Sequence, residues 1–165
     1  MERKTGITIG GDTVPTLNEI LYETGKRICK SFIAVYKSAQ QTLPKTTYAK
    51  ITMGAISEKM GDAFELYDGG VRATREVYAL LGGALYCNGG LTANDTVYIK
   101  LYVNNVAGST IYTQKSVAGA QSFPIAPAIV HLGAGDIIHF YATNATAARG
   151  TLPAYYQNRM VLIEL

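Results

Sequence analysis

The pattern of hydrophobic and polar residues changes its period near residue 30. Before that point, five apolar side chains recur at the spacing that places residues on one face of a helix, namely Val14, Leu17, Ile20, Leu21 and Ile28. Asp12 or Thr13 can cap such a helix, and Pro15 suits its first turn. We therefore expect residues 1–30 to form a short arm and a helix, whose apolar face packs on the domain or docks on a partner.

From residue 31 onward, apolar and polar residues alternate at a period of two, which is typical of half-buried strands. In 96–104, Tyr98 and Tyr102 alternate with aliphatic residues, so both rings are expected on the outward face of a strand. The glycine pair at 82–83 predicts a bulge or a close approach of another backbone. Short strands separated by Asn, Gly and Pro predict an all-β sandwich. The expected strands are 31–36, 48–53, 76–88, 96–104, 109–117, 122–132, 136–143 and 158–165.

The last of these strands, 158–165, is apolar on both sides. Met160 and Leu162 fall on one side, and aliphatic residues also occupy the other. A sandwich strand needs only one apolar face, so the second predicts a strand covered at a subunit interface. We assign Met160 and Leu162 to this subunit interface, together with Tyr98 and Tyr102, because tyrosine suits half-buried contacts.

The composition supports coverage by other subunits. Of the 165 residues, 48% are hydrophobic and only 16% are charged, with a net charge of +3. That is few charges for a monomer of this size, so other subunits are expected to cover apolar surface. The positive charges are dispersed, which excludes the basic patch of a nucleic-acid-binding protein. Since the chain shows neither a signal-peptide core nor about 18 consecutive apolar residues, we expect no signal-driven secretion and no membrane insertion.

Cys29 and Cys87 are the two cysteines of the chain. They form no CxxC motif and no cysteine–histidine cluster, so the spacing of a zinc site is absent. A chain of this length can bury enough surface to fold without a disulfide. Two free thiols are therefore favoured over a single 29–87 bridge.

The segment "VHLGAGDIIHFYA" holds both histidines of the chain, His131 and His139, on either side of Asp136. Gly133 and Gly135 permit a turn there, and the carboxylate of Asp136 can hydrogen-bond to its own backbone. We interpret the segment as strand, turn and strand, with the histidines on the sheet surface. Since His139 points opposite to its neighbour, we expect it to face solvent or another subunit. We expect no catalytic, cofactor-binding or metal-ligating residues, and no cofactor.

The stretch "MGDAFELYDGG" at 60–70 contains three acidic residues, Asp62, Glu65 and Asp68. Loops that bind calcium carry more oxygen ligands over the same length than this stretch does. We therefore expect a solvated loop, with a weak carbohydrate or ion site as the alternative.

The order of motifs over 31–165 resembles that of the complement C1q-like and tumour-necrosis-factor-like jelly-roll family. "SFIAVYKSAQQTLPKTTYAKI" is similar to the opening strand of that family, and "VYALLGGALYCNG" is similar to a later long strand. "YIKLYVNN" places Asn104 at the family's asparagine, and "IVHLGAGDIIHFYAT" matches its Gly-Asp turn at Gly135 and Asp136. One departure is Glu76, which stands where the family usually has glycine.

The resemblance implies a homotrimer of jelly rolls, each with two antiparallel sheets, preceded by a short arm, and it makes the predicted subunit interface a trimer interface. We therefore expect 1–30 to anchor the trimer to capsid or other virion proteins, and 31–165 to form the head. With no signal peptide and no collagen repeat, a bacteriophage head fibre or capsid decoration protein is favoured, made in the host cytoplasm and located in the virion. Host-surface carbohydrate is a further expected partner. The alternative is an adhesive trimer on a bacterial surface or spore coat, and an enzyme is the least favoured class.

Overall fold

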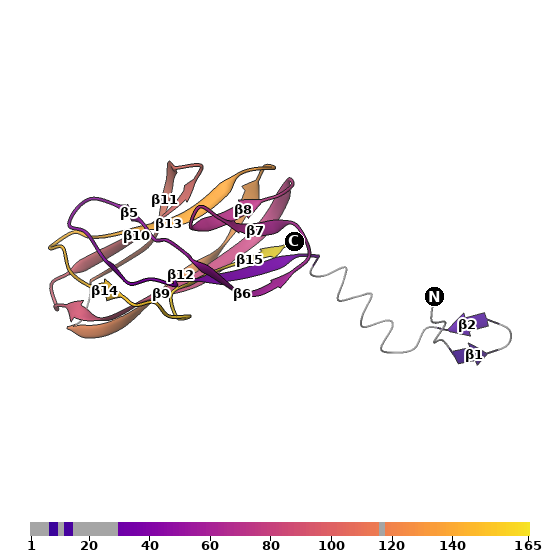
Figure 1. Cartoon of the computed structure of the whole chain (residues 1–165), viewed down its shortest axis with the longest axis horizontal. Helices are drawn as coiled ribbons and strands as arrows, with labels where there is room; N and C mark the ends of the chain where they lie inside the picture. The colour runs from indigo at the N-terminus through magenta and orange to yellow at the C-terminus, as the bar shows by residue number, and fades with distance from the viewer. Residues whose placement is uncertain (1–6, 10–11, 15–29, 116–117) are drawn as a thin grey trace.

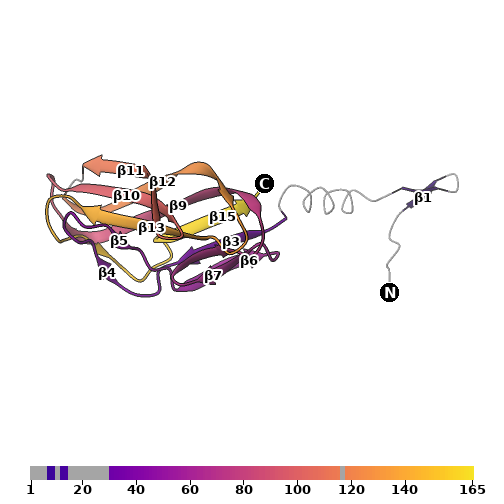
Figure 2. The ribbon, with the colours of Figure 1, turned by 90° about the horizontal axis from the view of Figure 1, so that it is seen from above.

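The computed structural model describes residues 7–9, 12–14, 30–115 and 118–165. Residues 30–165, apart from 116–117, form two antiparallel sheets that face each other (Figures 1 and 2). The first sheet runs in the order β11 (Val106–Lys115), β10 (Thr96–Val103), β13 (Ile137–Asn144), β8 (Gly70–Ala73) and β7 (Phe64–Tyr67), with β5 (Ala49–Lys50) also paired to β13. The second sheet runs in the order β12 (Gly119–Leu132), β9 (Val77–Leu91), β15 (Arg159–Glu164), β3 (Phe32–Tyr36) and β6 (Ala55–Met60).

Two short strand pairs complete the secondary structure. β4 (Gln41–Thr42) pairs with β14 (Thr151–Leu152) beside the sandwich, and β1 (Ile7–Ile9) pairs with β2 (Asp12–Val14). The described residues contain no helix, and none of their elements could cross a membrane as a helix. The predicted all-β, two-sheet jelly roll is confirmed.

The predicted N-terminal helix cannot be compared with the structure over most of its length. Leu17, Ile20, Leu21 and Ile28 lie outside the described residues. Val14, the first residue of the predicted apolar face, is described and pairs with Ile7 in the β1–β2 hairpin. The proposed role of 1–30 as an anchor therefore stays a prediction.

The prediction of a solvated loop at 60–70 is wrong for most of this stretch. Residues 64–67 form β7, which pairs with β8 from Phe64 opposite Ala73 to Tyr67 opposite Gly70. Asp68 and Gly69 make the connection with φ angles of 46° and 73°. An Asp-Gly pair with two positive φ values is the preferred two-residue hairpin turn, so the "DG" in the sequence was the signal of a hairpin.

The core lies between the two sheets and is filled by alternate side chains of their strands. In β15 this alternation places Met160 and Leu162 inside, each fully buried in the core of the single chain. The assignment of Met160 and Leu162 to a trimer interface is therefore wrong, because a neighbouring subunit cannot reach them. The outward side of the same strand carries Val161 and Ile163, which are half-buried.

The glycine pair in β9 coincides with an irregularity in the second sheet. The register of β12 against β9 shifts between Ile125 and Ala128, opposite Gly82 and Gly83. A Cβ at Gly83 would collide with the carbonyl oxygen of Arg159 on β15, whereas a Cβ at Gly82 would meet nothing within 4 Å. Both parts of the prediction for 82–83, a bulge and a close backbone approach, are confirmed.

Candidate interaction surface

The two histidines and the acid between them do not form a site. His131 lies on β12 of the second sheet, where it pairs with Tyr78, while His139 lies on β13 of the first sheet. The ring of His131 stacks on Tyr78 at a centroid distance of 4.5 Å, and its Nε2 lies 2.9 Å from a carboxylate oxygen of Glu76. Within the described ranges, no three His, Cys, Asp or Glu side chains are grouped to hold a metal ion.

The prediction that His139 faces solvent or another subunit is wrong, because the β7–β8 turn covers it. Its side chain is fully buried, and its Nε2 lies 3.1 Å from the backbone carbonyl oxygen of Asp68. Gly70 lies so close to the imidazole that a Cβ there would collide with it. Burial lowers the pKa of His139 from its ordinary value. His139 is thus a neutral packing residue that fixes the hairpin onto the sheet.

Asp136 lies in the turn between β12 and β13 and has a structural role. Its Oδ2 accepts a hydrogen bond of 2.7 Å from the backbone N–H of Gly133, and its Oδ1 accepts one of 2.6 Å from the amide of Asn104. The Asn104 and Gly133 donors hold the pKa of Asp136 below its ordinary value. Gly135 occupies the turn with a φ of 89°, which favours glycine. The Gly-Asp motif therefore stabilises the turn.

Tyr98 and Tyr102 lie on the outer face of the first sheet, where both are half-buried. The Tyr102 ring stacks on Tyr141 at 3.9 Å, and the Tyr141 hydroxyl donates a hydrogen bond to the side chain of Asn105. The ammonium of Lys100 lies 4.6 Å from the centre of a further tyrosine ring. These tyrosines pack within one chain and among polar groups, and their role in a trimer stays a prediction.

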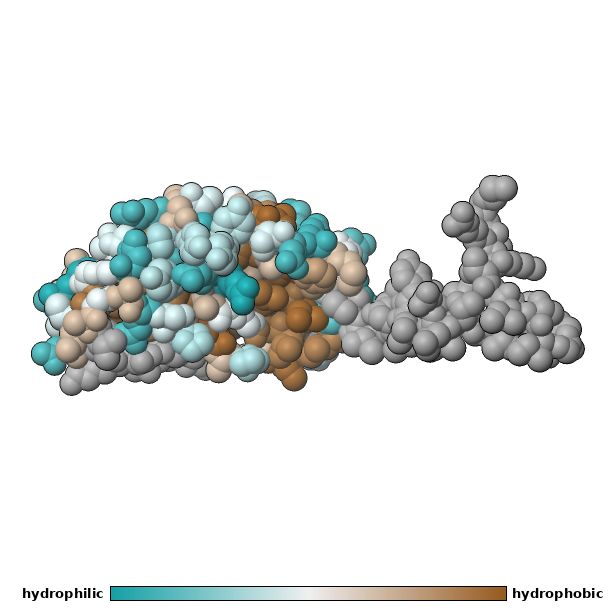
Figure 3. Space-filling model, turned by 90° about the horizontal axis from the view of Figure 1, so that it is seen from below, coloured by the Kyte–Doolittle hydropathy of each residue, from teal (hydrophilic) through white to brown (hydrophobic). Residues whose placement is uncertain are grey.

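The outer face of the second sheet is apolar over half of its length. Ile129 on β12, Leu80 on β9 and Ile163 on β15 lie opposite one another in one cross-strand row. Three side chains on this face are strongly exposed, Tyr78 by 60%, Ile129 by 69% and Leu165 by 57%. Figure 3 shows the resulting apolar surface. We call it the apolar half, and its members are Tyr78, Leu80, Ile129, Val161, Ile163 and Leu165.

Arg159 marks the end of the apolar half. It is the first residue of β15, and it pairs across the sheet with Ala84, which in turn pairs with Pro124 of β12. A hollow of about 150 Å³ lies on the apolar side of this row, between Leu80, Pro127 and Val161. Arg159 lines this hollow and also a larger one on the other side of the row.

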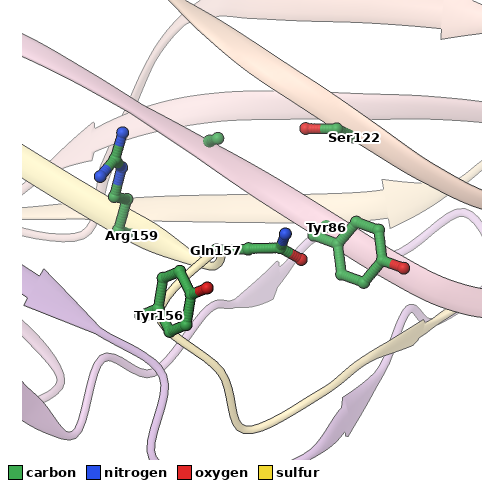
Figure 4. A pocket seen from close by; sticks show the side chains of 6 residues that line it. Tyr86, Ser122, Tyr156, Gln157 and Arg159 are labelled. Atoms are coloured by element: carbon green, nitrogen blue, oxygen red, sulfur yellow. The ribbon is translucent and has the colours of Figure 1, made fainter.

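The larger hollow, which we call the polar hollow, has a volume of about 320 Å³. Its lining combines two phenol rings, a hydroxyl, an amide and a guanidinium with one small apolar side chain. The lining residues are Ala84, Tyr86, Ser122, Tyr156, Gln157 and Arg159. Figure 4 shows these side chains, which come from β9, β12, the turn that leads into β15 and the first residue of β15. The small side chain of Ala84 leaves the space between them open.

The turn that supplies Tyr156 and Gln157 is fixed by Asn158, which is fully buried. The Oδ1 atom of Asn158 accepts a hydrogen bond of 2.7 Å from the backbone N–H of Tyr86, and its Nδ2 atom donates one of 3.0 Å to the carbonyl of Pro153. Its own backbone carbonyl accepts a hydrogen bond from the N–H of residue 37 on the chain leaving β3. One side chain thus connects the turn to β9 and holds the wall of the polar hollow in place.

Comparison with known proteins identifies the fold. No family model and no curated protein sequence matches the chain. Among solved structures, murine APRIL shares 14% sequence identity with a TM-score of 0.60, over 82% of this chain and 98% of APRIL. The Eiger TNF from S. frugiperda shares 16% identity with a TM-score of 0.57, over 81% of this chain and 91% of Eiger. The PRD1 vertex protein P5 shares 7% identity with a TM-score of 0.56, over 82% of this chain and 95% of P5. The chain therefore has a tumour-necrosis-factor-like jelly-roll fold.

Proposed function

We propose that the chain is a structural protein of a bacteriophage virion, a head fibre or a capsid decoration protein, which acts as a homotrimer without enzymatic activity. The observation that carries the assembly is the apolar half of the second sheet. A contiguous apolar surface on a soluble protein marks an interaction site. On this chain it extends across β12, β9 and β15, with Ile129 exposed by 69% and Leu165 by 57%.

A second and third copy of the chain are the partners that fit this surface. Val161 and Ile163 face outward from β15, which has a strand on either side, and no described strand of the same chain lies over them. Head-to-tail contacts around a threefold axis close into a ring. Each copy would bury its apolar half against the next. Tyr98 and Tyr102 lie on the opposite outer face, and the proposed contact does not include them.

The virion setting has separate support. The fold is shared with the PRD1 vertex protein P5, a protein of a virus particle, at an identity that indicates the fold alone. The titratable groups of the described residues offer no metal-binding cluster, and the paired Asp136 and buried His139 have structural roles. Residues 1–30 would attach the trimer to the shell, and the jelly roll would project from it.

Substitutions on the two outer faces test the assembly. Lysine at both Ile129 and Ile163 should dissociate the trimer, because it places two charges in the apolar half without altering the core. Lysine at both Tyr98 and Tyr102 is the matched control and should leave the mass unchanged in size-exclusion chromatography with light scattering. If the tyrosine variant dissociates and the isoleucine variant does not, the contact lies on the first sheet.

Mass spectrometry of purified particles tests the virion setting. Particles from lysates that contain the protein should carry it in a fixed ratio to the major shell protein. Deletion of residues 1–30 should leave a folded trimer that no longer copurifies with particles. Finding the full chain only in the soluble fraction, or finding the truncated chain on particles, would contradict the proposed location and the proposed anchor respectively.

A further inference from the structure

We propose that the polar hollow is a binding site for a sugar unit that carries a carboxylate. Such a site would define the chemical class of the host-surface carbohydrate that the sequence analysis expects as a partner, and it rests on the proposed virion role for its biological setting. The lining supplies the two kinds of contact that a pyranose ring needs. Tyr86 and Tyr156 offer aromatic surface for its C–H groups, and Ser122 and Gln157 offer hydroxyl and amide groups for its own hydroxyls.

Arg159 would make the polar hollow prefer a sugar that carries a carboxylate. Within the described part of the chain its guanidinium makes no ion pair, whereas Arg72, Arg75 and Arg149 are each paired with a carboxylate. The fork of N–H donors matches the two oxygens of a carboxylate. The side chain of Arg159 also borders the apolar half, and it is exposed, so its donors are open to a ligand. A carboxylate in the hollow would therefore be the missing partner of Arg159.

The hollow is built before any ligand arrives. Tyr86 and Ser122 are paired residues of adjacent strands, and Ala84 and Arg159 form a second such pair. The turn that carries Tyr156 and Gln157 is held by the buried Asn158. Most of the lining is thus fixed by the backbone of the sheet, so little conformational freedom is lost on binding.

The hollow also remains open in the proposed trimer. The row formed by Arg159, Ala84 and Pro124 separates it from the apolar half, which the neighbouring copy would cover. Its volume of about 320 Å³ suits one sugar unit and lies near the lower limit of small-molecule sites. A single unit would bind weakly. Three equivalent hollows on one particle component would raise the avidity without further contacts.

Isothermal titration of the full chain with three acidic probes tests this site. The probes are α-1,4-linked trigalacturonate, a glucuronate-terminated oligosaccharide and an N-acetylneuraminate-terminated oligosaccharide. Neutral α-1,4-galactotriose is the matched probe without carboxylates. At least one acidic probe should bind with saturation. Galactotriose should bind at least tenfold more weakly than trigalacturonate, since it lacks the carboxylate that accepts the charged hydrogen bonds of Arg159.

Three variants locate the binding. Arg159→Gln should weaken the acidic probe at least tenfold, and Ala84→Leu should abolish binding because it fills the hollow from an outward position. Lys45→Gln removes the same charge at an exposed residue elsewhere and should bind as the wild type does. The site is overturned if no acidic probe binds, if both hollow variants bind normally, or if galactotriose equals trigalacturonate.

The mass of each sample separates this site from the proposed assembly. Light scattering on the same protein reports whether the trimer is intact in every variant. A trimer that binds no acidic probe overturns the site and leaves the assembly standing. A monomer that binds an acidic probe through Arg159 overturns the assembly and leaves the site standing.

Discussion

Replacing Asp95 by asparagine should lower the free energy of unfolding by about 2 kcal/mol at pH 7. The carboxylate of Asp95 is fully buried, yet it is matched by the guanidinium of Arg149. The Nε and Nη2 atoms of Arg149 donate to both oxygens at 2.8–3.0 Å. The backbone N–H of Thr92 donates a further hydrogen bond of 2.8 Å to Oδ2. Asp95 thus connects the β9–β10 turn to the loop after β13.

The magnitude follows from the pKa of Asp95. The Arg149 hydrogen bonds lower it from 3.8 to about 2, against the opposing effect of burial. At about 1.4 kcal/mol for each pKa unit, this difference corresponds to about 2 kcal/mol of stability. Because the pKa is lower in the folded chain than in the unfolded chain, the stabilisation is fully present above pH 3.8. It is lost as the pH falls through about 2.

Urea denaturation of the wild type and Asp95→Asn between pH 7 and pH 2 measures this contribution. The experiment is run at one protomer concentration, because the stability of an oligomer depends on concentration. The difference between the two proteins should be about 2 kcal/mol at pH 7 and should shrink below pH 4. Other carboxylates titrate equally in both proteins and cancel. Equal stability at pH 7, or a difference that stays constant down to pH 2, would refute the role given to the Asp95–Arg149 pair.

Three further substitutions or treatments test the packing. Gly83→Ala should lower the free energy of unfolding, measured by thermal unfolding, by about 2–3 kcal/mol, because its Cβ collides with a strand carbonyl. Gly82→Ala should be nearly neutral for folding, and equal effects of the two substitutions would contradict the close approach. Burial raises the pKa of Cys87 to about 12, so iodoacetamide at pH 8 should modify this thiol only after unfolding. Peptide mass spectrometry measures the modification, and rapid labelling of the native chain would contradict the burial of the thiol. Lys37 is fully buried with its ammonium hydrogen-bonded to Gln41, and burial lowers its pKa. Lys37→Met should therefore raise the urea midpoint of unfolding at pH 7, by an amount that decreases toward pH 10.5. A lower midpoint would contradict this.

The sandwich and most of its strands could be predicted from the sequence because alternation reports burial directly. Segment 96–104 shows this, since Val97 and Ile99 are in the core and Tyr98 is half-buried on the outside. The hairpin at 64–73 was missed because its strands are short and mixed in character, although its Asp-Gly turn was a usable signal. Local periodicity is weak in strands of four residues, so tertiary pairing decides their structure.

Only part of the candidate surface could be predicted from the sequence. The two apolar sides of 158–165 correctly indicated that a second face exists on this strand, but periodicity cannot say which side faces the core. The structure places Met160 inside and Val161 outside. For His139 the alternation gave the correct side of the sheet and the wrong exposure, because it could not show that Asp68 and Gly70 cover the ring. The polar hollow joins three segments distant in sequence, so no local pattern reveals it.

Sedimentation equilibrium of the full chain at several concentrations tests the trimeric assembly most directly. The chain has a mass of 17.7 kDa, so three copies amount to about 53 kDa. We expect a single species of that mass at micromolar concentration, since association of the copies would cover the apolar half. A species of 17.7 kDa at every concentration would contradict the homotrimer and leave the apolar half without its proposed partner.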